Sequence, residues 1–223
     1  MPSLLLLNGS PRGEHSNSMK MLTRLAQGWT SAGGGEIIVL HLAQKSDFKK
    51  AVALYTESDT VLLGMPLYAD RLPGLVKEYF EELAISPGFL HTQHLPVTGF
   101  LVQSGFMEAL HCRPLERYLQ KLSGKISSGY AGTIVRGGGE ALRSAPEESF
   151  HKLWKQLNAL GAQLATQKRF QAETLHAVAG MERLSPVLAF ALRLLFPFIK
   201  FYWNRDLKKN GVWAERYARP YEP

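Results

Sequence analysis

The sequence is short of cysteine, and it lacks several patterns that would define a function class at once. Cys112 is the only cysteine in 223 residues, so a disulfide framework is excluded and a reducing compartment is expected. Neither a Gly-x-Gly-x-x-Gly dinucleotide fingerprint nor the Gly-Lys-Ser/Thr of a Walker-type triphosphate site occurs. No secretory signal pattern is visible at the N-terminus, and we therefore expect a cytoplasmic protein.

Long runs of one charge are also missing, although the chain is basic, with a formal net charge of +7 and a pI near 9.5. A basic surface can attract nucleotides, anionic lipid or nucleic acid. No Lys/Arg run is long enough, and no aromatic-interleaved basic motif clear enough, to indicate a nucleic-acid partner. His91 and His94 have no carboxylate or cysteine at a suitable spacing, so no metal site is expected.

What is present begins with residues 4–18, LLLLNGSPRGEHSNS. The run Leu4 to Leu7 has the pattern of a strand buried on both faces, and it breaks at Asn8. Apolar residues at helical spacing start again at Leu22, with Ser16 available as the N-cap. The sequence therefore predicts a strand, a hydroxyl-rich loop and a helix N-terminus in succession.

This order suits an anion, because the first turn of a helix has unpaired N–H groups and a partial positive charge. The candidate phosphate ligands are Ser10, Arg12, Ser16, Asn17 and Ser18. They fit a single terminal phosphate. The alternative is an ordinary strand-to-helix turn whose serines only cap the helix.

Strands and helices alternate along most of the chain. The further expected strands are 36–42, 60–64, 97–103 and 130–135, and the expected helices lie at 46–57 and after Leu72, Pro114 and Ser144. This alternation indicates an α/β protein with right-handed crossovers and a parallel sheet. The length suits one domain with a sizeable core.

GSPR followed by SNS after the first strand resembles the NADPH-dependent FMN reductase family, within the flavodoxin-like superfamily. The resemblance continues at MPLYADRLPGLVKEYFEEL (65–83), QSGF (103–106) and RGGGEAL (136–142), and it covers about residues 3–167. It implies a doubly wound five-stranded sheet of strand order 2-1-3-4-5. The family includes iron–sulfur flavoproteins, but one cysteine cannot supply their cluster.

The resemblance also implies a bound FMN and its surroundings. The isoalloxazine ring would lie along Pro66, Leu67, Tyr68 and Ala69, and the loop at Ser104 and Gly105 would lie near the ribityl chain and the ring. Tyr68 would be a wall residue, with simple core packing as its alternative. Asp70 and Arg71 could be exposed loop charges or could meet substrate. Gly137 to Gly139 could form a third ligand-facing loop or a plain flexible turn.

The expected activity is transfer of hydride from NAD(P)H through the flavin to a small acceptor such as a quinone, a nitroaromatic or free flavin. The cofactor carries this chemistry, so no catalytic acid, base or nucleophile is required. Cys112 follows His111, but sequence neighbours need not face each other. Two alternatives remain: a flavodoxin-type electron carrier, and a non-enzymatic interaction protein that has lost the cofactor.

Residues 168–223 are expected to form a helical extension beyond a flavodoxin-like domain at 1–167. Residues 168–183 have no clear period and are interpreted as a connector. The apolar stretch from Val187 to Trp203 contains two cations, Arg193 and Lys200, and Pro197 should break its helix, so a membrane span is not expected. The stretch would pack on the domain, form a homo-oligomer, or lie in a membrane interface through residues 185–203.

Overall fold

Five parallel strands form one sheet in the order β2-β1-β3-β4-β5, as predicted. The computed structural model describes residues 3–219, except for the side chains of residues 198 and 199. The strands are β1 (Leu4–Asn8), β2 (Ile37–His41), β3 (Thr60–Pro66), β4 (Val97–Gln103) and β5 (Gly129–Arg136). Within the register, Asn8 stands between His41 and Gly64, and Gln103 stands between Pro66 and Arg136.

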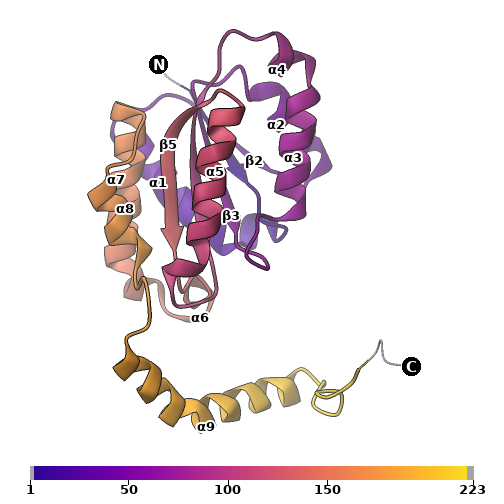
Figure 1. The fold of residues 1–223 in the computed structure, drawn as a ribbon, viewed down its shortest axis with the longest axis vertical. Helices are drawn as coiled ribbons and strands as arrows, with labels where there is room; N and C mark the ends of the chain where they lie inside the picture. The colour runs from indigo at the N-terminus through magenta and orange to yellow at the C-terminus, as the bar shows by residue number, and fades with distance from the viewer. Residues whose placement is uncertain (1–2, 220–223) are drawn as a thin grey trace. The chain divides into compact units, whose positions relative to one another are not determined.

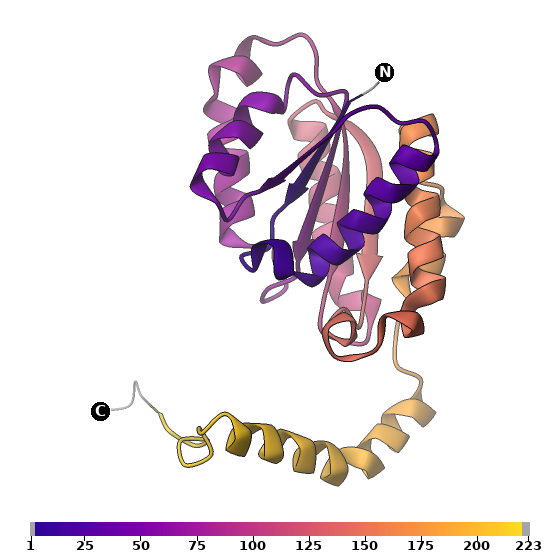
Figure 2. The same cartoon turned by 180° about the vertical axis from the view of Figure 1, so that it is seen from behind.

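Helices cover both faces of the sheet (Figures 1 and 2). One face is covered by α1 (Asn17–Ser31) and α7 (His151–Gln167), and the other by α2 (Lys45–Leu54), α3 (Gly74–Ile85) and α5 (Arg113–Lys125). Leu4 and Leu6 belong to the first core, whereas Leu5 and Leu7 belong to the second. A strand that faces two cores needs apolar residues at every position, which explains the leucine run.

Two glycines bring α1 and α7 together. A Cβ atom at Gly28 would overlap the carbonyl oxygen of Asn158, and one at Gly161 would overlap that of Leu25. Only glycine permits this backbone approach. Short helical segments lie in the connections between these strands and helices. They are η1 (Gly13–His15), α4 (Pro87–His91), η2 (Ala109–Cys112), α6 (Ala141–Ser144) and η3 (Glu147–Phe150).

The first compact unit ends at Arg183, beyond the boundary at residue 167 that the sequence indicated. Residues 168–183 are not a plain connector, because they contain α8 (Ala172–Ala179), which packs on β5 and α7. Beyond it, Arg113 makes two hydrogen bonds to Glu182, of 3.1 and 2.9 Å, and these raise the pKa of Arg113. The prediction failed because an eight-residue helix that buries only Val178 and Ala179 shows no readable period.

The second unit, Leu184–Pro223, contains α9 (Pro186–Lys209). Ser185 caps this helix by accepting a 3.2 Å hydrogen bond from the Leu188 N–H. Pro197 bends the helix by 47° rather than ending it, which corrects the predicted break. Proline removes one helical hydrogen bond and crowds the preceding turn, and a bend relieves the crowding. Within residues 3–219, no single helix is long and apolar enough to cross a membrane, although the two arms of α9 meet that test together.

Candidate functional site

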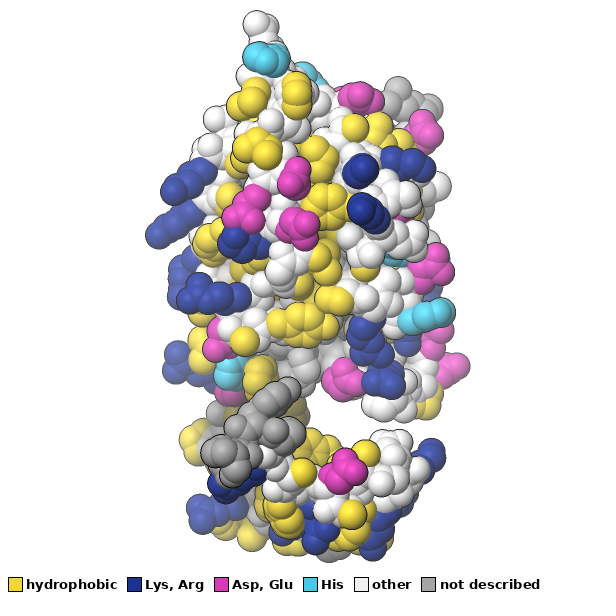
Figure 3. Space-filling model, turned by 90° about the vertical axis from the view of Figure 1, so that its right-hand side faces the viewer, with side chains coloured by type: hydrophobic (Ala, Val, Ile, Leu, Met, Phe, Trp, Pro, Cys, Tyr) yellow, Lys and Arg dark blue, Asp and Glu magenta, His cyan; other side chains and the backbone are white. Residues whose placement is uncertain are grey.

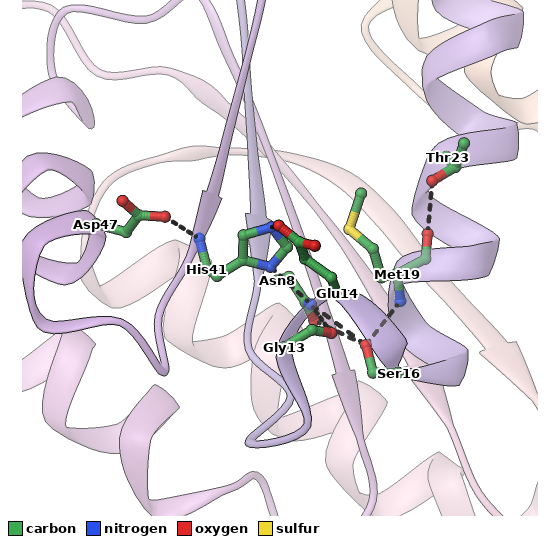
Figure 4. A network of polar contacts seen from close by, with 8 residues as sticks. All are labelled: Asn8, Gly13, Glu14, Ser16, Met19, Thr23, His41 and Asp47. Carbon is green, nitrogen blue, oxygen red and sulfur yellow. Dashed lines mark hydrogen bonds and ion pairs between the residues drawn. The ribbon is translucent and has the colours of Figure 1, made fainter.

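The loop between β1 and α1 is shaped by one buried side chain, that of Asn8 (Figure 4). Its Nδ2 donates to the Gly13 carbonyl at 2.7 Å and lies 3.2 Å from Ser16 Oγ. Its Oδ1 accepts from the Ser10 N–H at 3.1 Å. Because one amide holds three points of the loop, Asn8 sets the loop's shape, a role that sequence reasoning missed.

His41, at the end of β2, completes this network. Its Nδ1 lies 3.1 Å from Asn8 Nδ2, and Asp47 accepts a 3.0 Å hydrogen bond from the His41 backbone N–H. The nearest acid to its Nε2 is Glu14, at 3.9 Å. His41 is itself buried, and it supports the loop from the neighbouring strand.

The N-terminus of α1 is capped as predicted. Ser16 has extended backbone angles, and its Oγ accepts a 3.0 Å hydrogen bond from the Met19 N–H. The first two N–H groups of the helix, those of Asn17 and Ser18, have no intrahelical partner by the geometry of any α-helix. The helix therefore presents two N–H donors and the positive end of its dipole at this loop.

The five candidate phosphate ligands divide by their contacts. Ser10, Ser16, Asn17 and Ser18 are buried, and Arg12 is exposed. The Asn17 side chain donates to the Gly139 carbonyl at 2.8 Å, and Ser18 Oγ accepts from Gln103 at 3.4 Å, so both tie α1 to other loops. The groups that remain suited to an anion are the N–H groups of Asn17 and Ser18, the Ser10 hydroxyl and the Arg12 guanidinium.

The loop after β3 is a tight turn. Tyr68 and Arg71 exchange two backbone hydrogen bonds of 3.0 and 2.9 Å, and the turn residues Ala69 and Asp70 both have positive φ, 45° and 62°. This is the geometry of a two-residue turn that asparagine and glycine usually occupy. An alanine in the left-handed region costs about 1 to 2 kcal/mol, and such strain is concentrated at functional sites.

This turn places Tyr68 on the surface, where 45% of it is exposed, so core packing does not explain the residue. Pro66 ends β3, and the N–H of the next residue, Leu67, donates to the Gln103 carbonyl at 2.8 Å. Beside the turn is a cavity of about 560 Å³. It is lined by Ala69, Asp70, Arg71, Leu72, Lys77, Pro114, Leu115 and Tyr118.

The loops after β4 and β5 lock together. The Ser104 N–H donates to the Arg136 carbonyl at 3.0 Å, and the Gly139 N–H donates to the Ser104 carbonyl at 2.7 Å. Gly138 has φ of 70° and donates to the Phe106 carbonyl. The glycine loop is therefore a held structure and not a plain flexible turn. Gly105 is exposed between these anchors.

Phe106 and Met107 follow Gly105 and are exposed, Phe106 by 59%. The ring of Phe106 lies 4.5 Å from that of His111. Sequence reasoning did not select this apolar pair, although two exposed hydrophobic residues directly after a strand end are the signal that could have found it.

Cys112 is fully buried, and this burial raises the pKa of its thiol to about 11. A thiol that remains protonated is a poor nucleophile. In residues 3–219 no cluster of three or more His, Cys, Asp or Glu side chains could hold a metal ion.

The polar loops after β1 and β3 lie where the strand order reverses, since β2 and β3 flank β1 on opposite sides. Doubly wound sheets bind ligands at this switch point. Sheet order, loop positions and helix arrangement together define a flavodoxin-like α/β fold, as the resemblance implied.

Comparison with known proteins agrees with this class. The family described as having a flavodoxin-like fold matches residues 2–103. An FMN-dependent NADH-azoreductase from Bacillus anthracis, solved in complex with FMN, has a TM-score of 0.58 at 14% identity, covering 74% of this chain and 100% of its own. An NADPH-quinone reductase from P. pentosaceus has a TM-score of 0.54 at 16% identity, covering 75% and 99%.

An NAD(P)H:quinone oxidoreductase from Methanothermobacter marburgensis has a TM-score of 0.53 at 12% identity, covering 73% of this chain and 96% of its own. At these identities the likeness shows a shared fold. No curated protein sequence matches the chain.

Proposed function

We propose that the chain is an FMN-dependent oxidoreductase that passes hydride from NAD(P)H to a small acceptor such as a quinone, a nitroaromatic or free flavin. The observation that carries this proposal is the pairing of two loops at the switch point. One is an anion-type loop that opens a helix, and the other is a strained turn beside a cavity. The named activities of the similar structures support the same class.

The donor set fits the phosphate of a mononucleotide. Two helix N–H groups, a serine hydroxyl and an exposed guanidinium are the groups that proteins use for a single phosphate. Ser16 and Asn17 contribute by holding the loop, through the cap and through the bond to Gly139. We therefore assign Ser10, Arg12, Ser16, Asn17 and Ser18 to phosphate binding.

The isoalloxazine ring of FMN would lie at the sheet edge formed by residues 66–69 together with Ser104 and Gly105. Tyr68 offers an exposed aromatic surface to a flat ligand, and the locked glycine loop holds Ser104 in place. When bound, FMN supplies two-electron chemistry by accepting a hydride and passing electrons to the acceptor. The chain's residues bind and orient the reactants and need no acid, base or nucleophile of their own.

The cavity beside the turn is the proposed entrance for NAD(P)H and the acceptor. Arg71 lies in its lining beside Asp70, and Lys77, which is paired with Glu81, adds a second cation; these two cations are the groups that would meet the anionic pyrophosphate of a nicotinamide nucleotide. Leu72, Leu115 and Tyr118 give it the apolar wall that a quinone or nitroaromatic needs.

An absorption spectrum of the purified protein, followed by FMN titration, tests the cofactor. We expect flavin bands and release of mononucleotide on denaturation. Arg12→Ala should weaken FMN binding about fivefold, since an exposed charge pair contributes up to about 1 kcal/mol. It should leave riboflavin binding unchanged, because riboflavin has no phosphate. Arg117→Ala, an exposed arginine on α5, is the matched control.

Steady-state assays separate the alternatives. A reductase oxidises NAD(P)H when a quinone is supplied, whereas an electron carrier needs a partner reductase. A protein that has lost the cofactor binds no added FMN, and that result would refute the proposal.

We also propose a homo-oligomer formed through the first unit. Phe106, Met107 and Tyr118 expose apolar surface that a second copy could cover. Sedimentation velocity of the flavin-loaded protein at micromolar concentration should show a dimer, and a monomer would contradict this part of the proposal.

A further inference from the structure

Helix α9 carries few charges up to Trp203, and they lie on one narrow face. On an ideal straight helix of 100° per residue, Arg193, Lys200 and Asn204 would fall within an arc of about 40°. Outside this stripe, the large side chains up to Trp203 are apolar, and eight of them are 51% to 80% exposed. These are Val187, Phe190, Leu194, Leu195, Phe196, Phe201, Tyr202 and Trp203.

The width of this apolar surface indicates what covers it. A helix that docks on a protein surface buries a stripe of roughly 100° or somewhat more, and its remaining faces are polar. Here the apolar residues occupy nearly the whole circumference outside the Arg193–Lys200–Asn204 stripe. One domain surface or one partner helix would leave much of that surface in water, whereas lipid acyl chains can surround it.

The charges near α9 indicate which kind of lipid headgroup would attract it. The second unit has seven Lys or Arg against three Asp or Glu, and Figure 3 shows basic and hydrophobic side chains mixed over α9. Arg205, Lys208 and Lys209 gather in the last turns of the helix with one acid, Asp206. Clusters of cations next to an apolar helix are attracted to anionic headgroups.

Aromatic residues mark the boundary between the apolar and basic parts. Tyr202 and Trp203 end the apolar stretch, and Arg205 lies over the Tyr202 ring at 5.0 Å. Farther along, Arg216 lies 4.0 Å from the Trp213 ring. Tyrosine and tryptophan concentrate at the headgroup level of membranes, where one end of the ring is apolar and the other is wet.

We propose that α9 docks the protein on an anionic membrane surface, immersed in the headgroup and acyl boundary with its Arg193–Lys200–Asn204 stripe toward the headgroups. The two cations within the apolar stretch favour a helix that lies in the interface over one that crosses. The choice of acceptor rests on the proposed function. A reductase docked on a membrane works at the surface that holds lipid-soluble quinones, so we assign such a quinone as its acceptor.

Flotation of the full-length protein with vesicles tests the docking directly. We expect binding to phosphatidylcholine vesicles that contain phosphatidylglycerol, and weak binding to phosphatidylcholine alone. Tryptophan emission should shift to the blue on binding, and Trp203→Phe should reduce that shift. Equal binding to both vesicle types, or binding to neither, would overturn the proposal.

Two triple variants test whether the cations of α9 are responsible for binding to anionic vesicles. The triple change Arg205→Gln, Lys208→Gln and Lys209→Gln should weaken binding to anionic vesicles about 100-fold, at about fivefold for each cation. The control removes the same charge from α2 through Lys45→Gln, Lys49→Gln and Lys50→Gln, all exposed, and should bind as before. Equal losses in both triple variants would also overturn the assignment to α9.

The pair Phe190→Glu and Leu194→Glu tests the apolar surface and should abolish binding to all vesicles. If it instead converts a dimer to a monomer in solution and leaves vesicle binding unchanged, the surface belongs to a second copy and the proposal fails. For the acceptor, the variant should lose reduction of a long-chain quinone in vesicles and keep reduction of a short soluble one. Vesicle binding without bound flavin would refute the proposed function while the docking stands.

Discussion

Replacing Asn8 by alanine should disrupt the loop on which the phosphate assignment depends. The substitution removes the hydrogen bonds to Gly13, Ser16 and Ser10, of 2.7, 3.2 and 3.1 Å. Each bond contributes about 1 kcal/mol net, so the loss in free energy of unfolding should be about 3 kcal/mol. Because Asn8 is fully buried, water cannot replace these bonds without opening the loop.

Urea unfolding of the apoprotein measures this loss. With a slope of about 2 to 3 kcal/mol/M, the midpoint should fall by about 1 M. Asn158→Ala is the control, because Asn158 Oδ1 is buried without a hydrogen-bond partner in the part of the chain that the structure describes. That change should cost little or nothing. A fall of less than about 0.3 M for Asn8→Ala would refute the reasoning.

Asn8→Asp separates loop shape from charge. The aspartate can still accept from the Ser10 N–H, but it cannot donate to Gly13 or Ser16, and it adds a negative charge beside the proposed phosphate site. FMN affinity should therefore fall more than riboflavin affinity. Equal losses for the two ligands would show that no phosphate binds near this loop.

Three further changes test other parts of the structure. Gly28→Ala should lower the free energy of unfolding by about 3 kcal/mol or more, because the new methyl group would overlap the Asn158 carbonyl. A loss below about 1 kcal/mol, measured by urea unfolding, would contradict the close contact between α1 and α7. Ala69→Gly should raise the free energy of unfolding by about 0.5 kcal/mol, since relief of the left-handed alanine exceeds the added chain entropy, whereas Ala69→Val should lower it. At pH 8, Cys112 should resist alkylation in the native protein and react only on unfolding. With a pKa of about 11, only about 0.1% of the buried thiol is ionised. Rapid labelling of the native protein would contradict this prediction.

Local sequence patterns were sufficient to predict the structure wherever a residue's environment follows from its neighbours in the chain. The leucine run after Ser3, the cap at Ser16 and the alternation of strands and helices each depend on backbone geometry within a few residues. The strand order came from the resemblance to a known family, and the sheet confirms it.

Contacts between distant segments were not readable in the same way. Asn17 bonds to Gly139, and Ser18 bonds to Gln103, so two expected phosphate ligands also hold the loops together. No spacing in the sequence indicates these pairs, because they form only when the strand ends meet at one edge of the sheet.

The sequence alone is enough to predict the α/β class, the position of the polar loop before α1 and the unusual composition of α9, because hydrophobic period, capping residues and charge are local properties. The folded structure was needed to show that Asn8 and His41 shape that loop, that Ala69 and Asp70 form a strained turn, and that the first unit continues through α8. These features depend on the register between strands and on which side chains become buried together, and a chain acquires both only when it folds.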